Sequence, residues 1–459
     1  MEAFMEEVVT AFIGWAWGWP LVIVITATAV IYSISLKFVQ FRRFGFIMRH
    51  TFGKITSKEV RGEGTLTPFQ AASSALAGTL GVGNIAGVGV AVGLGGPGAL
   101  FWMWVVALLA AVAKYAEVVL GIRYREKDPE TGIFRGGFMY TVTNGLGKNW
   151  KWLALLWSFL LFIQFLIGGA VQSNALADVT DSSYGLDKLI AGIILAVLVG
   201  LVIIGGIKRI GKVAEKLVPV MAVIYFVGAL VIIIVHIGEV PAAIAQIFGS
   251  AFGAAEATGG FAGATIMMAL RNGFARGVYS NEAGMGTSPI AHATAQTDHP
   301  SRQGVWGIFE VFVDTIVMCT MTGLVIMVTG ALETGEVGAS LTATAFDQGL
   351  PGPGDWIVTI SVIIFAYTTI LVAGFYSETG GVYCFGNKIV MPYRFVYLAG
   401  LIVGAVGGLQ IIWGLFDAFM AITVAINLAV IVSLRKEVMR LTADFFGSNG
   451  NPSETIGSE

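Results

Sequence analysis

The sequence predicts an all-α polytopic membrane protein, on three observations. Of its 459 residues, 56% are hydrophobic and 12% are charged, whereas soluble domains carry about 25% charged residues. The mean hydropathy is +0.80. Apolar stretches long enough to cross a bilayer recur along the whole chain. We predict eleven transmembrane helices, at residues 15–37, 68–92, 98–122, 152–177, 187–206, 215–237, 259–297, 304–330, 355–377, 393–410 and 412–434.

Lysine and arginine residues are distributed unevenly over the loops that connect these helices. The loop from Lys37 to Arg61 holds seven of them, while the alternate loops hold only Lys188. By the positive-inside rule, the N-terminus lies outside the cell membrane and the C-terminus lies in the cytoplasm. Two outer loops, 238–258 and 331–354, are moderately apolar and lack Lys and Arg. We expect each of them to form a short helix over an outer vestibule, with an ordinary surface loop as the alternative.

The composition gives little support to other classes of function. A formal net charge of −2 gives no reason to expect a nucleic-acid partner. Cys319 and Cys384 lie in or beside apolar segments, so no disulfide framework is implied. The sequence shows no metal cluster, no HExxH motif and no Ser/His/Asp constellation, and we do not expect an enzyme.

The second predicted helix contains a stretch that interrupts it, Gly78-Thr79-Leu80-Gly81-Val82-Gly83-Asn84. Glycine is the poorest ordinary residue for a helix interior, and broken backbone at membrane depth survives only inside protein or where it lines a cavity. We therefore interpret this stretch as a helix broken near the bilayer centre, with its freed N–H and C=O groups facing a small solute or ion. A close contact between helices through small residues is the alternative.

The seventh predicted helix, 259–297, is too long for one plain span and is also rich in glycine and polar residues. Counting from its outer end places the bilayer centre near Asn272 to Gly277. The stretch Ser280–Gly286 then lies nearer the cytoplasm, as a gate or as the break itself. Without the first helix, the other ten divide into two oppositely oriented groups of five, each of which begins with an interrupted helix. This arrangement is typical of secondary transporters.

The division predicts four parts of the chain. They are an extra N-terminal helix with a cytoplasmic linker (1–66), a first five-helix repeat (67–237), an outer loop helix with the second, inverted repeat (238–440), and a disordered cytoplasmic tail (441–459).

Two longer motifs carry a resemblance to a known family. Gly95-Gly96-Pro97-Gly98-Ala99-Leu100-Phe101-Trp102-Met103-Trp104 resembles one signature of the alanine or glycine:cation (sodium:alanine) symporter family, and residues 276–284 followed by 289–293 resemble the second. The resemblance implies a leucine-transporter (LeuT) type fold of two inverted five-helix repeats. It also implies import of alanine or glycine with Na⁺ or H⁺. Gly78 and Thr79 stand at positions where the leucine-transporter branch of this fold has other residues. The number of Na⁺ ions therefore stays open.

A zwitterionic amino acid needs partners for two opposite charges. Its carboxylate suits N–H groups at a half-helix N-terminus, and our candidates are the amides of Val82, Gly83 and Asn84 with the Thr79 hydroxyl. Its ammonium group needs acceptors, for which the carbonyls around Asn272, Gly273 and Phe274 are candidates. Further candidates for substrate contacts are the aromatic side chains of Phe165 and Phe274 and the amides of Gln164 and Gln172.

The resemblance also implies ion sites, because Na⁺ is bound by hard oxygen ligands. One site would use the carbonyls of Ala77 and Leu80 with the hydroxyls of Thr368 and Thr369. A second would use Thr79 and Asn84, with Asp314 open as a proton or Na⁺ ligand.

Charged side chains in the membrane are functional candidates by default. We expect Arg276 and Glu282 to form a gate, Glu310 to face Arg271 or Arg276, and Lys114 to pair with Glu117.

The expected function is sodium-coupled symport of small neutral amino acids, alanine or glycine, by alternating access. A proton-coupled symporter of the same substrates is the alternative. A channel is less favoured, because selectivity rings are usually built by symmetric oligomers, whereas this chain alone carries two different breaks. The expected partners are therefore the amino acid, Na⁺ and the lipid bilayer, with the protein acting as a monomer.

Overall fold

A computed structural model describes residues 2–55, 62–253, 262–407 and 410–447. The longer helices are α1 (Glu2–Ala16), α2 (Trp19–Ser35), α5 (Pro68–Thr79), α6 (Val88–Gly95), α7 (Gly98–Arg123), α9 (Lys151–Tyr184), α10 (Lys188–Ile203), α11 (Gly206–Val235), α12 (Val240–Ala251), α13 (Ala262–Asn281), α15 (Pro300–Val311), α16 (Thr320–Val328), α17 (Ala339–Gly349), α18 (Pro353–Phe385), α19 (Val390–Val406), α20 (Gln410–Ser433) and α21 (Arg435–Phe446).

Shorter elements connect these helices. They are the helices α3 (Val39–Arg42), α4 (Phe44–His50), α8 (Phe138–Thr141) and α14 (Ser288–His292), and the strands β1 (Glu126–Lys127) and β2 (Phe134–Arg135). The π-helical turns are Gly83–Gly87, Val142–Leu146 and Phe312–Cys319, and the 3₁₀ turns are Phe52–Lys54, Lys148–Trp150, Ile237–Glu239, Ala331–Thr334 and Asn387–Ile389. β1 and β2 form an antiparallel pair.

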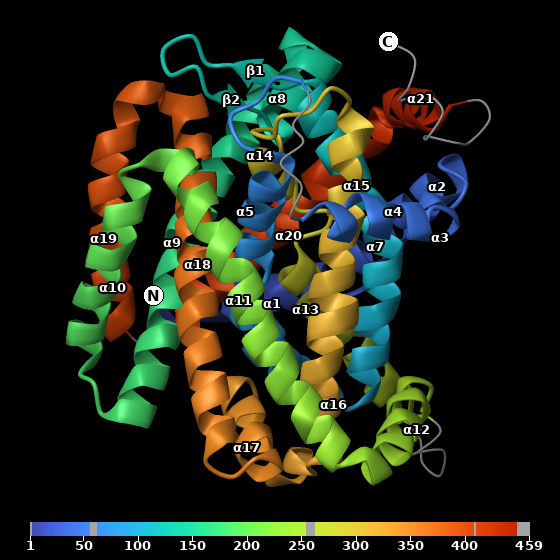
Figure 1. Ribbon diagram of the computed structural model, residues 1–459, viewed down its shortest axis with the longest axis vertical. Helices are drawn as coiled ribbons and strands as arrows, with labels where there is room; N and C mark the ends of the chain where they lie inside the picture. Colours follow the sequence, from blue (N-terminus) through green and yellow to red (C-terminus); the bar gives the residue numbers. More distant parts are fainter. Residues whose placement is uncertain (1, 56–61, 254–261, 408–409, 448–459) are drawn as a thin grey trace.

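The long helices form one bundle, with α12 and α17 at one end and β1, β2, α8 and α21 at the other (Figure 1). Among the described residues, eight helices are long and apolar enough to cross a membrane, or nine with one bent pair. The two other predicted spans correspond to α10 and α13. The membrane fold is therefore confirmed, while the exact number of eleven spans is not.

Three predictions about the ends and loops have different outcomes. The first span was predicted at residues 15–37, whereas the apolar helical stretch long enough to cross a membrane runs from Glu7 to Ser35, through parts of α1 and all of α2. Both expected outer-loop helices are present, as α12 and α17. The tail was predicted to be disordered from residue 441, yet α21 continues to Phe446. It is anchored there because Ser301 donates a hydrogen bond to the Leu441 carbonyl at 3.1 Å. Residues 448–459 lie outside the described part of the chain.

The first break lies where the sequence predicts it. Thr67 and Gln70 cap the N-terminus of α5 by reciprocal hydrogen bonds, and the helix ends at Thr79. After Leu80 the chain turns into the π-helical turn Gly83–Gly87. The axis of the helix bends by 49° between Pro68–Thr79 and Gly83–Gly95.

The second break is displaced from the predicted position. α13 is continuous through Asn272–Gly277 and ends at Asn281. The chain then turns through Glu282, Gly284 and Gly286, whose φ angles are +54°, +91° and +77°, before α14 begins. The prediction of a break near Asn272 to Gly277 is therefore wrong, and the alternative at Ser280–Gly286 is correct.

Close packing explains the glycines of α13 that suggested a break. A Cβ atom on Gly273 would lie 2.5 Å from the carbonyl oxygen of Ala99, and one on Gly277 would lie 2.5 Å from Val106 Cγ1. Both contacts are on α7, so these two glycines, four residues apart, allow the helices to approach closely.

We predict that Gly273→Ala destabilises the protein by about 1–3 kcal/mol, the usual effect of overpacking, and lowers its melting temperature in detergent. Gly400→Ala on α19 is the matched control, because a Cβ atom there meets nothing within 4 Å and alanine is the better helix former. An equal melting temperature for Gly273→Ala and the unmodified protein would contradict this account of the α7–α13 contact.

Candidate functional site

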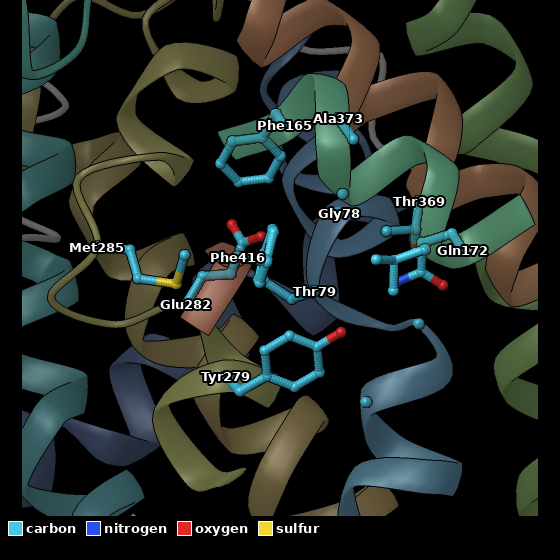
Figure 2. A pocket seen from close by; sticks show the side chains of 14 residues that line it. Gly78, Thr79, Phe165, Gln172, Tyr279, Glu282, Met285, Thr369, Ala373 and Phe416 are labelled. Atoms are coloured by element: carbon cyan, nitrogen blue, oxygen red, sulfur yellow. The ribbon is translucent and has the colours of Figure 1, made fainter. Parts of the chain in front are cut away.

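One pocket lies where the two breaks meet. Its lining residues come from α5, α9, α13, α18, α20 and both breaks: Gly78, Thr79, Gly81, Gly83, Phe165, Gly168, Val171, Gln172, Tyr279, Glu282, Met285, Thr369, Ala373 and Phe416. The space open to the centre of a water molecule is about 30 Å³, where one water needs about 10–15 Å³. The pocket is therefore matched to a small solute (Figure 2).

Aromatic rings form much of the wall. Phe416 makes edge-to-face contacts with Phe165 and Tyr279, at centroid distances of 6.1 and 6.0 Å. A Cβ atom on Gly168 would lie 2.9 Å from the Phe416 ring, so this glycine lets the ring approach α9. Phe274 lies elsewhere, with its ring 6.3 Å from that of Trp102.

Five polar side chains line the pocket: Thr79, Gln172, Tyr279, Glu282 and Thr369. Gln172 Oε1 has no hydrogen-bond partner among the described residues. Gln164 does not line the pocket, and its Oε1 accepts a hydrogen bond from Thr423 of α20 at 3.3 Å. Of the two glutamines considered from sequence, only Gln172 therefore faces the pocket.

The first break and α18 meet at Thr369. The Thr369 hydroxyl donates to the Ala77 carbonyl at 3.0 Å, and a Cβ atom on Gly81 would lie 2.6 Å from that hydroxyl. Thr368 points elsewhere: its hydroxyl donates to the carbonyls of Ile364 and Phe365 in its own helix. Thr369 and Ala77 thus form a cluster of hard oxygens at the break, and Thr368 stands outside it.

A buried carboxylate joins the two breaks. Asp314 Oδ1 accepts a hydrogen bond from Asn84 Nδ2 at 2.7 Å, and Asp314 Oδ2 accepts one from Ser280 Oγ at 2.8 Å. Thr315 donates to the same Oδ2 at 2.8 Å. The Asn84 side chain also accepts from the Gly81 N–H at 3.0 Å. Asp314 therefore connects the turn after α5 to the last residues of α13.

A second buried polar cluster lies beside the end of α13. Lys114 Nζ forms an ion pair with Glu310 at 3.0 Å and donates to the Asn281 carbonyl at 2.7 Å. Glu310 also contacts His292 Nε2 at 2.5 Å. Glu117 instead accepts hydrogen bonds from Asn427 and from the Gly286 N–H. The predicted Lys114–Glu117 pair is therefore wrong, because Lys114 reaches across to α15.

The expected partners of Arg276 are wrong as well. Arg276 forms an ion pair with Asp417 of α20 at 3.0 Å, and its guanidinium group lies 5.6 Å from the centre of the Tyr279 ring. It pairs with neither Glu282 nor Glu310. Glu282 accepts a hydrogen bond from the Thr287 hydroxyl at 2.7 Å. Arg276 and Glu282 thus belong to two different contacts and do not pair with each other.

Other candidates from the sequence are not among the residues that line the pocket. They are Val82, Asn84, Asn272, Gly273, Phe274 and Leu80. Sequence reasoning missed Tyr279, Met285, Phe416 and the nearby Asp417. Asp417 had a usable signal, because an acidic residue within a membrane helix is a functional candidate by default.

The polar groups of the pocket and the two breaks are suited to binding an ion and a small polar molecule. Within the described residues, no group of three or more His, Cys, Asp or Glu side chains is placed to hold a metal ion. At Thr369 and Ala77 the available ligand atoms are a hydroxyl oxygen and a carbonyl oxygen, uncharged hard oxygens that suit a monovalent cation. The pocket also offers one carboxylate, which suits the cationic end of a small zwitterion.

Comparison with known proteins agrees with this geometry. The chain is similar to an uncharacterized transporter of Bacillus subtilis, YflA, with 43% identity over 91% of this chain and 88% of that protein. It is 40% identical to the sodium/alanine symporter AgcS of Methanococcus maripaludis, over 91% of this chain and 92% of AgcS. Among solved structures, MhsT in complex with L-phenylalanine matches with a TM-score of 0.57 at 15% identity, covering 84% of this chain and 90% of MhsT, which shows a LeuT-type fold.

The family model described as the sodium:alanine symporter family matches residues 1–455. The match spans nearly the whole chain, including both breaks and the pocket between them. The chain belongs to the sodium:alanine symporter family.

Proposed function

We propose that the protein is a Na⁺-coupled symporter that imports alanine or glycine by alternating access. The observation that carries the proposal is the position of the pocket: it lies between two broken helices and is lined by both breaks. The family and its relative AgcS support amino-acid symport. The small volume of the pocket and its aromatic walls favour a substrate with a very small side chain.

In this proposal the ion lies at the first break. The Thr369 hydroxyl and the Ala77 carbonyl are already 3.0 Å apart, so a Na⁺ ion placed beside them would have two hard oxygen ligands, and the Leu80 carbonyl is a further candidate. The substrate carboxylate would meet the Thr79 hydroxyl and the backbone of the break near Gly83. Because one chain supplies all these groups, we propose a monomer as the functional unit.

The distribution of basic residues suggests how the protein is oriented in the membrane. The end of the bundle that carries β1, β2 and α21 (Figure 1) includes many of the basic residues, among them Arg123, Arg125, Lys127 and Arg440. We therefore propose that this end and the C-terminus face the cytoplasm.

Uptake of radiolabelled alanine into proteoliposomes tests the proposal. We expect saturable accumulation that depends on an inward Na⁺ gradient. One Na⁺ charge moving across about 100 mV contributes roughly 2.3 kcal/mol, which corresponds to about 50-fold accumulation. A proton gradient that drives the same uptake without Na⁺ would indicate proton coupling. Equilibration without accumulation would indicate a channel.

We predict that Thr369→Ala raises the Na⁺ concentration for half-maximal alanine uptake about tenfold, since the variant lacks one oxygen ligand. Thr368→Ala is the matched control. Its hydroxyl bonds carbonyls of its own helix, so we expect a change of less than about threefold. Equal effects of the two substitutions would remove Thr369 from the proposed ion site.

We predict that Asp314→Asn lowers the melting temperature and abolishes uptake, because the variant disturbs three hydrogen bonds to a buried carboxylate. Such bonds are worth about 1.5–3 kcal/mol each. The exposed Asp355 at the start of α18 provides the control Asp355→Asn, which should change neither property. If Asp314→Asn instead keeps its melting temperature and only shifts the Na⁺ dependence, Asp314 is a ligand of a second ion and not the link between the breaks.

A further inference from the structure

Glu282 occupies a position that is unfavourable for a carboxylate in three respects. Its backbone has a φ angle of +54°, a left-handed conformation that residues other than glycine rarely adopt. It follows directly on the last residue of α13, where the helix dipole is negative and disfavours an anion. Its side chain is buried, with 6% of the residue exposed.

The protein compensates this charge only in part, because Lys114 acts on it at longer range without forming an ion pair. Among the described residues, Glu282 has no ion-pair partner, and the two nearby basic side chains are engaged elsewhere: Lys114 with Glu310 and Arg276 with Asp417. Lys114 does reach the end of α13, but there it binds the Asn281 carbonyl. The Glu282 carboxylate receives one hydrogen bond, from Thr287 to Oε2.

The carboxylate lines the pocket. Of the fourteen described residues around it, Glu282 alone carries a charge. Figure 2 shows the Glu282 carboxylate among the side chains that line the pocket. A cation that enters the pocket would therefore meet a carboxylate without an ionic partner, in a region shielded from water, where the attraction between opposite charges is strong.

We propose that Glu282 binds the ammonium group of the substrate and thereby selects amines over other small carboxylates. This inference rests on the proposed function and names the group that recognises one end of the substrate. It replaces the carbonyls of Asn272, Gly273 and Phe274, which are held within a continuous helix. A buried anion at a strained position destabilises the empty protein, and the arriving ammonium group offsets part of that cost.

Competition assays on the unmodified protein give the first test. We expect alanine and glycine to compete with radiolabelled alanine for binding, while propionate and lactate, which lack the ammonium group, do not compete at a hundredfold higher concentration. Competition by propionate as strong as that by glycine would overturn the proposal. Binding of alanine without Na⁺-driven uptake would overturn the proposed function while leaving the role of Glu282 standing.

Substitutions give the second test, with alanine affinity and melting temperature measured on the same purified protein. Glu282→Gln should weaken alanine binding at least tenfold. Glu282→Gly removes both the charge and the backbone strain, so it should raise the melting temperature while abolishing binding. A merely structural residue would show the opposite, a lower melting temperature. Unchanged alanine affinity in Glu282→Gln would overturn the proposal.

A matched control separates charge in the pocket from buried charge in general. Glu117 is also buried beside the second break, but it does not line the pocket. We expect Glu117→Gln to leave alanine affinity within about threefold. If Glu282→Gln changes only the Na⁺ or pH dependence of uptake, and alanine affinity stays the same, the carboxylate serves the coupling ion and the proposal fails.

Discussion

A helix that breaks inside a membrane leaves backbone polar groups that lipid cannot satisfy, and this constraint organises the centre of the molecule. At the first break Asn84 satisfies one of these backbone groups, because its amide oxygen accepts a hydrogen bond from the Gly81 N–H. The other end of the same amide donates to Asp314, which also binds Ser280 near the end of α13. One buried carboxylate therefore both supports a break and fixes the distance between the two interrupted helices.

The first break could be predicted because its signals are local. Closely spaced glycines followed by Asn84 weaken the helix and supply the side chain that caps the opened turn. The second break was misplaced because glycine has two uses that composition does not distinguish. Gly273 and Gly277 lack side chains so that α13 can approach α7, whereas Gly284 and Gly286 permit positive φ angles. Only the three-dimensional contacts separate these uses.

The partners of the buried charges were harder to predict than the charges themselves. Lys114 and Glu117 lie one turn apart on α7, and that spacing favours a pair. Lys114 instead binds Glu310, nearly two hundred residues later, and Glu117 accepts from Asn427 of α20. Sequence gives no such long-range information without an alignment. Phe416 was missed for the same reason, since an aromatic residue in an apolar helix looks like ordinary packing until its neighbours are known.

The distribution of charge and of side-chain volume together define what the pocket can accept. Buried basic groups nearby are neutralised outside it, by Glu310 and Asp417, so the pocket keeps one carboxylate and no fixed cation among its described residues. A simple anion would find no cation there and would be repelled by the carboxylate, whereas a zwitterion can place its cationic end on the carboxylate and its anionic end on the dipoles of the broken helix. The aromatic wall approaches α9 through Gly168, which leaves space for a small side chain and little more. The aromatic wall thus limits the side chain of the substrate, while the carboxylate and the helix dipoles select its charged groups. Both effects depend on the two breaks facing each other.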